Sequence, residues 1–264
     1  MLAILIAGLI TCRMPSSWLE LRQLAERTDA SVFAVVSGSN SSVVDEFHAT
    51  VRPNRSLILD AAEEQQNIAA HTPWVKTKFL KTKTSGLCFR EDDCHASPHL
   101  LYKRHRGLDL FNHSAYNTIL VLRPDSWPRA VRELIPKAMT GLSGGADFVV
   151  GPDGRCEEWQ TGEQSPCARC VNDQWLYGES SAMAALLGSF PHLNSWMRRW
   201  QKERAFRPES KCGVGFTRRD HLREKFLLTP EGILGKSMRE LNMTCSYFPQ
   251  LPSAARALER RCGF

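Results

Sequence analysis

The chain has 264 residues, a formal net charge of +6 and a sequence pI of about 8.9. Hydrophobic residues make up 42% and charged residues 23%, which is typical of a globular protein and excludes a disordered chain. Much of the basic excess lies in residues 76–83 and 198–223 and suits anionic ligands such as nucleotides. The aromatic-interleaved basic stripe of a dedicated nucleic-acid binder is missing, so we expect no nucleic-acid partner.

An apolar run, residues 1–10, opens the chain and predicts a buried strand that ends at Gly8. It has no basic region before it and no small-residue cleavage site after it, unlike a signal peptide. It is also shorter than the roughly 20 residues that span a bilayer. We therefore expect no transmembrane segment, and a cytoplasmic location is favoured over a secretory one.

Nine cysteines and four Asn-x-Ser/Thr sequences, at Asn40, Asn54, Asn112 and Asn242, keep the secretory lumen open as an alternative. The pair Cys167 and Cys170 has zinc-ligand spacing but no clear second pair. A loop disulfide or free thiols are the competing interpretations.

Strand and helix patterns alternate along the chain. After the first strand come a helix over 18–26, a strand over 32–36, helix plus irregular loop over 60–97, and a helix over 100–111. A strand begins at Thr118, and a helix over 127–139, a strand over 146–150 and helices over 180–187 and 193–203 follow. This alternation predicts an α/β protein with a mostly parallel sheet and helices on both faces.

The strand that begins at Thr118 stops abruptly at Arg123-Pro124-Asp125. Ligands of open α/β sheets bind beyond the carboxyl ends of the strands. There Asp125 could hold Mg²⁺ or Mn²⁺ through its carboxylate oxygen, and Arg123 could donate charge-assisted hydrogen bonds to a phosphate. The alternative is a surface turn, for which Pro and Asp are suitable residues.

Residues 171–183 are dense in amides, aromatic rings and carboxylates just before a predicted helix. Asp173 could act as a base or hydrogen-bond an acceptor hydroxyl, Trp175 and Tyr177 could form an apolar platform for a sugar or a base, and Gly178 would permit close approach. A capped helix start with core aromatics is the alternative. The chain has no G-x-S-x-G, P-loop or dinucleotide motif, which disfavours a serine hydrolase or a P-loop kinase.

These elements resemble, in order and spacing, the small nucleotide-sugar glycosyltransferases of large algal viruses and their relatives, which glycosylate capsid proteins. The matching motifs are Ala7-Gly8, Thr11-Cys12, Arg123-Pro124-Asp125, the Asn172–Gly178 block with Met183, and Pro208-Glu209. The resemblance implies a GT-A-like, Rossmann-type fold in one domain, residues 1–264. Residues 1–125 would form the nucleotide-binding half and residues 126–264 the acceptor-side half.

The resemblance also implies an activity, the transfer of a hexosyl or pentosyl group from a nucleotide sugar, such as a UDP-sugar, to a hydroxyl of a glycan or glycoprotein. Mn²⁺ or Mg²⁺ on Asp125 would assist. The implied nucleotide-binding residues are Gly8, Arg13, Ser37, Ser39, Asn40 and Arg123. Asp173 and Glu209 would be catalytic, and Gln174, Trp175, Tyr177 and Gly178 would contact the substrate. The rival hypotheses are a catalytically inactive glycosyltransferase-like module that binds a carbohydrate or a protein, and a disulfide-linked extracellular binding domain.

Overall fold

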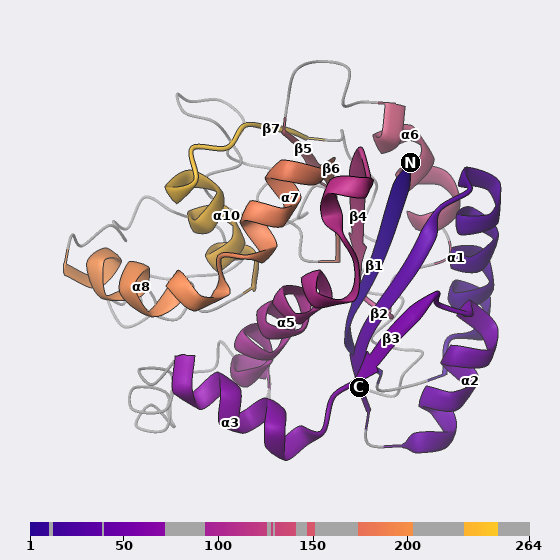
Figure 1. Ribbon diagram of the computed structural model, residues 1–264, viewed down its shortest axis with the longest axis horizontal. Coiled ribbons are helices and arrows are strands. Elements are labelled where there is room, and N and C mark those ends of the chain that lie inside the picture. The colour runs from indigo at the N-terminus through magenta and orange to yellow at the C-terminus, as the bar shows by residue number, and fades with distance from the viewer. Residues whose placement is uncertain are drawn as a thin grey trace, which may run out of the picture.

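A single seven-stranded sheet, in the order β3-β2-β1-β4-β6-β5-β7, organises the computed structural model (Figure 1). The structure describes residues 1–10, 13–38, 40–71, 93–125, 128, 130–140, 147–150, 174–202 and 230–247. The strands are β1 (Leu2–Leu9), β2 (Ser31–Ser37), β3 (Arg55–Ile58), β4 (Thr118–Leu122), β5 (Phe148–Val150), β6 (Trp175–Glu179) and β7 (Cys245–Tyr247).

Most neighbouring strands run parallel. β1 pairs in parallel with both β2 and β4, β2 with β3, and β5 with β7, whereas β6 runs antiparallel between β4 and β5. β1 and β4 are apolar and fully buried over most of their length, as expected of central strands covered on both faces. The predicted α/β class with a mostly parallel sheet is confirmed.

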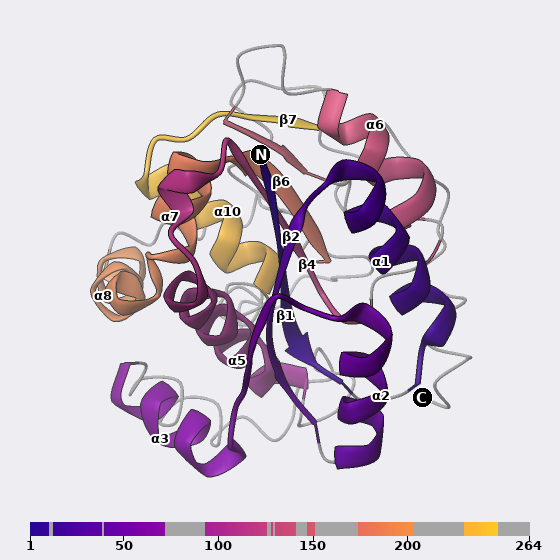
Figure 2. The ribbon, with the colours of Figure 1, turned by 45° about the vertical axis from the view of Figure 1, so that its right-hand side comes forward.

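Helices cover both faces of this sheet (Figure 2). The helices are α1 (Pro15–Thr28), α2 (Ser41–Val51), α3 (Ala61–His71), α5 (Asp93–Gly107), α6 (Ile135–Thr140), α7 (Ser180–Leu187), α8 (Leu193–Lys202) and α10 (Pro230–Glu240), with short turns η1 (Leu108–Leu110), η2 (His113–Ala115), η3 (Ala130–Leu134) and η7 (Phe190–His192). None of the described helices is long and apolar enough to cross a membrane.

Alternate residues of each strand enter two separate cores, because side chains alternate between the faces of a sheet. In β1, Ile4 and Ile6 pack with α1 and α2, around the fully buried Trp18. Leu5 and Ala7 pack on the opposite face with α5, α7 and α10. Each core buries both aliphatic and aromatic side chains, and this burial is the main stabilising contribution to folding.

The strand order changes direction between β1 and β4. From β1 the chain moves outward through β2 to β3, and it then crosses through α3 and α5 to β4 on the other side of β1. α1 and α2 lie on one face, whereas α3 and α5 lie on the other (Figures 1 and 2). The carboxyl ends of β1 and β4 therefore flank a topological switch point, the place where open α/β sheets bind ligands.

Several predicted elements have different limits in the structure. The 100–111 helix begins earlier, at Asp93, and ends at Gly107. The 127–139 helix is a π-helical turn over Ala130–Leu134 followed by α6, and Pro136, which has no N–H to donate, lies at this junction. Residues 175–179 form the internal strand β6, which the sequence analysis did not predict.

Candidate functional site at the carboxyl edge of the sheet

Arg123, Pro124 and Asp125 follow β4 directly and form the centre of the candidate site. The Arg123 guanidinium donates two hydrogen bonds to the Asp125 carboxylate, from Nε to Oδ1 at 2.9 Å and from Nη2 to Oδ2 at 2.5 Å. The two side chains are 33% and 31% exposed, so the pair reaches solvent at the sheet edge. A bidentate guanidinium–carboxylate pair fixes the orientation of both groups.

Three contacts hold this turn in place. The Trp18 indole Nε1 donates a buried hydrogen bond of 3.0 Å to the Pro124 carbonyl. The Arg123 backbone N–H donates to the Gln174 carbonyl at 2.9 Å. Gly8 lies against the Pro124 ring, and a Cβ at this position would lie 2.6 Å from Pro124 Cδ. Strands β1, β4 and β6 and helix α1 therefore all fix the position of the Arg123–Asp125 pair.

The segments after β1 and β2 lie at the same edge. Arg13 is largely exposed and ion-pairs through Nε with Glu46 Oε2 of α2, at 2.9 Å. Ser37 is buried at the end of β2, and its carbonyl accepts a hydrogen bond from the Ile10 N–H at 2.8 Å. Asn40 caps α2, because its Oδ1 accepts from the Ser42 N–H at 3.0 Å. These contacts give Ser37 and Asn40 structural roles, and their nucleotide contacts stay a prediction.

The aromatic block lies within the sheet. Trp175 and Tyr177 are 3% and 5% exposed and pack in the same core as Trp18, as the alternative interpretation of core aromatics expects. Neither ring presents a face to solvent, so a sugar platform has no support in this conformation. Gly178 is buried in β6 opposite Ile119 of β4. Of the four residues predicted to contact the substrate, Gln174 is the one whose backbone carbonyl accepts a hydrogen bond from Arg123, and it is half-buried just before β6.

Other predicted site residues lie outside the described residues: Ser39, Asp173 and Glu209, together with the pair Cys167 and Cys170. Their roles stay predictions. In chain order, Asp173 directly precedes Gln174, whose carbonyl is bonded to Arg123.

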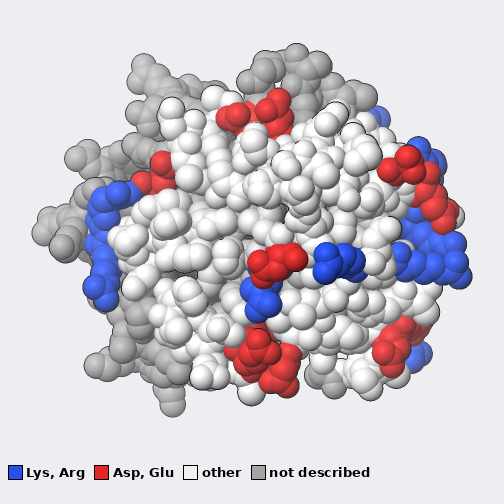
Figure 3. All heavy atoms as spheres, viewed as in Figure 1, with Lys and Arg blue, Asp and Glu red and all other residues white. Residues whose placement is uncertain are grey.

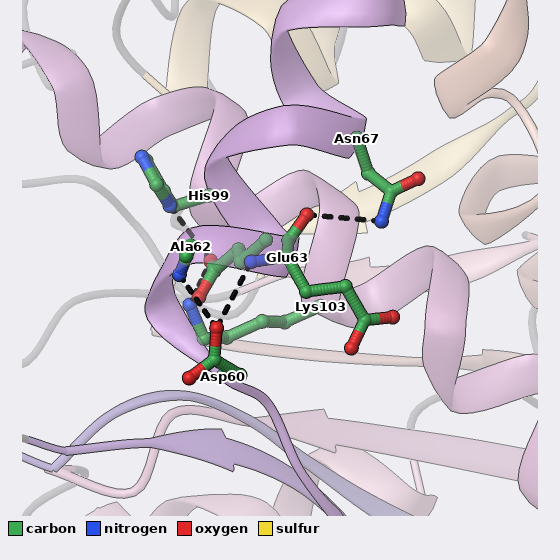
Figure 4. Close-up of polar contacts among 7 residues, drawn as sticks. Asp60, Ala62, Glu63, Asn67, His99 and Lys103 are labelled. Carbon is green, nitrogen blue, oxygen red and sulfur yellow. Dashed lines mark hydrogen bonds and ion pairs between the residues drawn. The ribbon is translucent and has the colours of Figure 1, made fainter.

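A buried charged cluster joins α3 to α5 beyond the carboxyl end of β3 (Figure 4). Glu64 Oε1 accepts a hydrogen bond from Lys103 Nζ and contacts His99 Nδ1 at 2.7 Å. The Glu64 and Lys103 side chains are each 3% exposed, whereas His99 is 28% exposed. Asp60 Oδ1 caps the helix that carries Glu64, accepting from the N–H groups of Ala62 and Glu63.

Burial and pairing act in opposite directions on this cluster. Burial raises the pKa of Glu64, but the hydrogen bonds and positive charges of His99 and Lys103 outweigh it and hold this pKa below its ordinary value. Burial lowers the pKa of Lys103, and the Glu64 carboxylate offsets part of that shift. The cluster is thus an ion pair that stabilises the fold only while both partners are present.

Two features of this edge escaped the sequence analysis. Trp18 precedes Pro124 by 106 residues, and no local pattern connects an indole N–H with a distant carbonyl. Glu64 lies in the polar segment 60–97, for which the sequence predicted a helix plus an irregular loop and no buried charge. In the structure Lys103 of α5 is buried with Glu64 and pairs with it.

Over the face seen in Figure 3, acidic and basic side chains are interspersed among the described residues. They do not form one continuous basic surface on that face. Among all described residues, no group of three or more His, Cys, Asp or Glu side chains is placed to hold a metal ion.

Comparisons with known proteins gave the following. No family model and no curated protein matches the chain. Among solved structures, the apo form of mouse xyloside xylosyltransferase 1 matches with a TM-score of 0.43 and 12% identity, covering 97% of this chain and 89% of that chain. A nucleotide-diphospho-sugar transferase of Desulfovibrio desulfuricans, named there as putative, matches with a TM-score of 0.39 and 10% identity, covering 94% and 79%. At these scores neither likeness carries an argument about this chain.

Proposed function

We propose that the protein is a nucleotide-sugar-dependent glycosyltransferase whose donor lies across the carboxyl ends of β1 and β4. The observation that carries this proposal is the Arg123–Asp125 pair, which is fixed at the switch point of the sheet and partly exposed to solvent, at 33% and 31%. A positioned guanidinium at this place suits the diphosphate of a nucleotide sugar. The resemblance of the ordered motifs to glycosyltransferases supports the same substrate class.

In the proposed reaction, the bond between the anomeric carbon of the sugar and the diphosphate oxygen breaks. A new bond forms between that carbon and the oxygen of an acceptor hydroxyl, and the hydroxyl proton passes to a base or to the departing diphosphate. Arg123 would stabilise the negative charge that develops on the leaving group, because a preorganised cation favours a transition state in which charge appears. Asp173 remains our proposed base, with Glu209 second.

The test is a transfer assay with a panel of nucleotide sugars and hydroxyl acceptors, monitored by release of the nucleoside diphosphate. We expect turnover that falls by about tenfold to a hundredfold in Arg123→Gln, since one charge-assisted contact to the leaving group is lost. Arg22→Gln is the matched control, because Arg22 forms an exposed ion pair with Glu26 within α1. A chain that binds a nucleoside diphosphate but shows no turnover would favour the inactive binding module instead.

A further inference from the structure

The metal expected at Asp125 does not fit the donor groups that the structure places there. A divalent cation such as Mn²⁺ or Mg²⁺ needs several anionic or carbonyl oxygens. Both oxygens of Asp125 accept hydrogen bonds from Arg123, at 2.9 and 2.5 Å. A dication bound to this carboxylate would lie beside a permanent positive charge, and at such separations this repulsion is large.

Neighbouring groups that the structure describes do not supply the missing ligands. Among the residues that the structure describes, no cluster of three potential metal ligands occurs at this edge or elsewhere. The nearest structural supports of the Arg123–Asp125 pair are the Trp18 indole, the Gln174 carbonyl and the Pro124 ring against Gly8. None of these three groups carries a negative charge, so none of them adds an anionic ligand for a cation.

A guanidinium held in a fixed orientation suits an anion better than a metal. A guanidinium carries five N–H donors in a fixed plane, a geometry that matches phosphate oxygens, and its charge does not depend on pH in the working range. In Arg123 at least two of these donors hold Asp125. Asp125 fixes the orientation of this plane, and the 33% exposure of Arg123 keeps part of its side chain at the sheet edge.

We infer that the site binds the donor diphosphate directly on Arg123, without a divalent cation, and that Asp125 is a positioning residue for the guanidinium. This inference rests on the proposed function, because it concerns the same donor site. The Arg123 guanidinium, a cation that belongs to the chain itself, takes the place of the expected metal ion.

Calorimetry of the full chain with UDP, GDP, ADP and CDP, each in excess EDTA and in Mn²⁺, tests the inference. We expect one of these nucleotides to bind with a Kd that changes by less than about threefold between the two conditions, well below the tenfold that one lost interaction produces. Arg123→Gln should raise the Kd in EDTA by about tenfold or more, whereas Arg22→Gln should leave it unchanged. Asp125→Asn should raise it less than Arg123→Gln, because the amide oxygen still accepts from the guanidinium.

The outcomes separate the two claims. Binding that occurs only with Mn²⁺, and that Asp125→Asn abolishes, would overturn the inference and leave the glycosyltransferase proposal in place. Failure of all four nucleotides to bind in either condition would overturn the proposed function itself. Thermal unfolding of each variant confirms that a lost signal does not come from a lost fold.

Discussion

The buried ion pair between Glu64 and Lys103 gives the sharpest prediction about stability. Both side chains are 3% exposed, and within the described part of the chain Glu64 also contacts His99, which is itself partly open to solvent. Lys103→Met removes the cation and leaves the Glu64 carboxylate buried with His99 as its remaining partner. We expect the free energy of unfolding at pH 7 to fall by about 3 kcal/mol, the lower end of the range for breaking a buried pair, because His99 compensates part of the charge.

The double variant Glu64→Leu with Lys103→Met separates charge from packing. It removes both charges and fills the space with apolar side chains of similar volume, so it should recover most of the loss and lie within about 1 kcal/mol of the original protein. Urea titrations followed by circular dichroism measure both values, and the cycle of single and double variants isolates the coupling. Arg22→Met, in an exposed pair, is the control and should cost at most about 0.5 kcal/mol.

Two results would refute this reasoning. A Lys103→Met variant that loses less than about 1 kcal/mol would mean that the pair behaves like an exposed one. A double variant as unstable as the single variant would mean that the lost stability comes from packing.

Three further predictions concern the candidate site and its surroundings. Gly8→Ala places a Cβ 2.6 Å from Pro124 Cδ, so the free energy of unfolding in denaturant should fall by about 1–3 kcal/mol and nucleotide binding should weaken. A variant with unchanged stability and binding would contradict the close contact. Trp18→Phe keeps an aromatic side chain but removes the indole N–H that donates to the buried Pro124 carbonyl, so stability should fall by at least about 1–3 kcal/mol. A loss no larger than that of an exposed substitution would remove Trp18 from the account. Burial lowers the pKa of His105 below 6.5, so the folded state prefers the neutral ring, and stability should fall as the pH drops below 6.5 because the unfolded chain takes up the proton first. His105→Asn should make stability depend less steeply on pH than the exposed control His113→Asn does. Equal slopes in the two variants would contradict this prediction.

Sequence patterns predicted the strands β1, β2 and β4 well because each of them is a short apolar run between polar loops. All three are buried over most of their length, and β4 ends at Leu122, directly before Arg123. The strand β3 escaped prediction because it lies at the edge of the sheet, where its four residues are mostly exposed and carry little apolar pattern.

β6 escaped prediction for the opposite reason. The sequence around Trp175, Tyr177 and Gly178 suggested either a binding platform or a capped helix start with core aromatics, and neither interpretation included a strand. Their burial depends on pairing with β4 and β5, whose residues lie more than 20 positions away in the chain for every pair. A tertiary contact of this kind overrides what the local composition suggests.

The same limit applies to the candidate site. The sequence placed Arg123 and Asp125 at a strand end, and the structure confirms that position. It did not predict that the two side chains bind each other, because residues two apart can equally point toward different partners. We infer from that pairing that Asp125 positions the guanidinium, in place of the metal binding expected from the sequence.

A structure of the protein crystallised with its nucleoside diphosphate tests the central claim most directly. The account predicts the diphosphate against the Arg123 guanidinium, beyond the carboxyl ends of β1 and β4 and close to Gly8. A nucleotide bound elsewhere, or a diphosphate at this edge that makes no contact with Arg123, would contradict it.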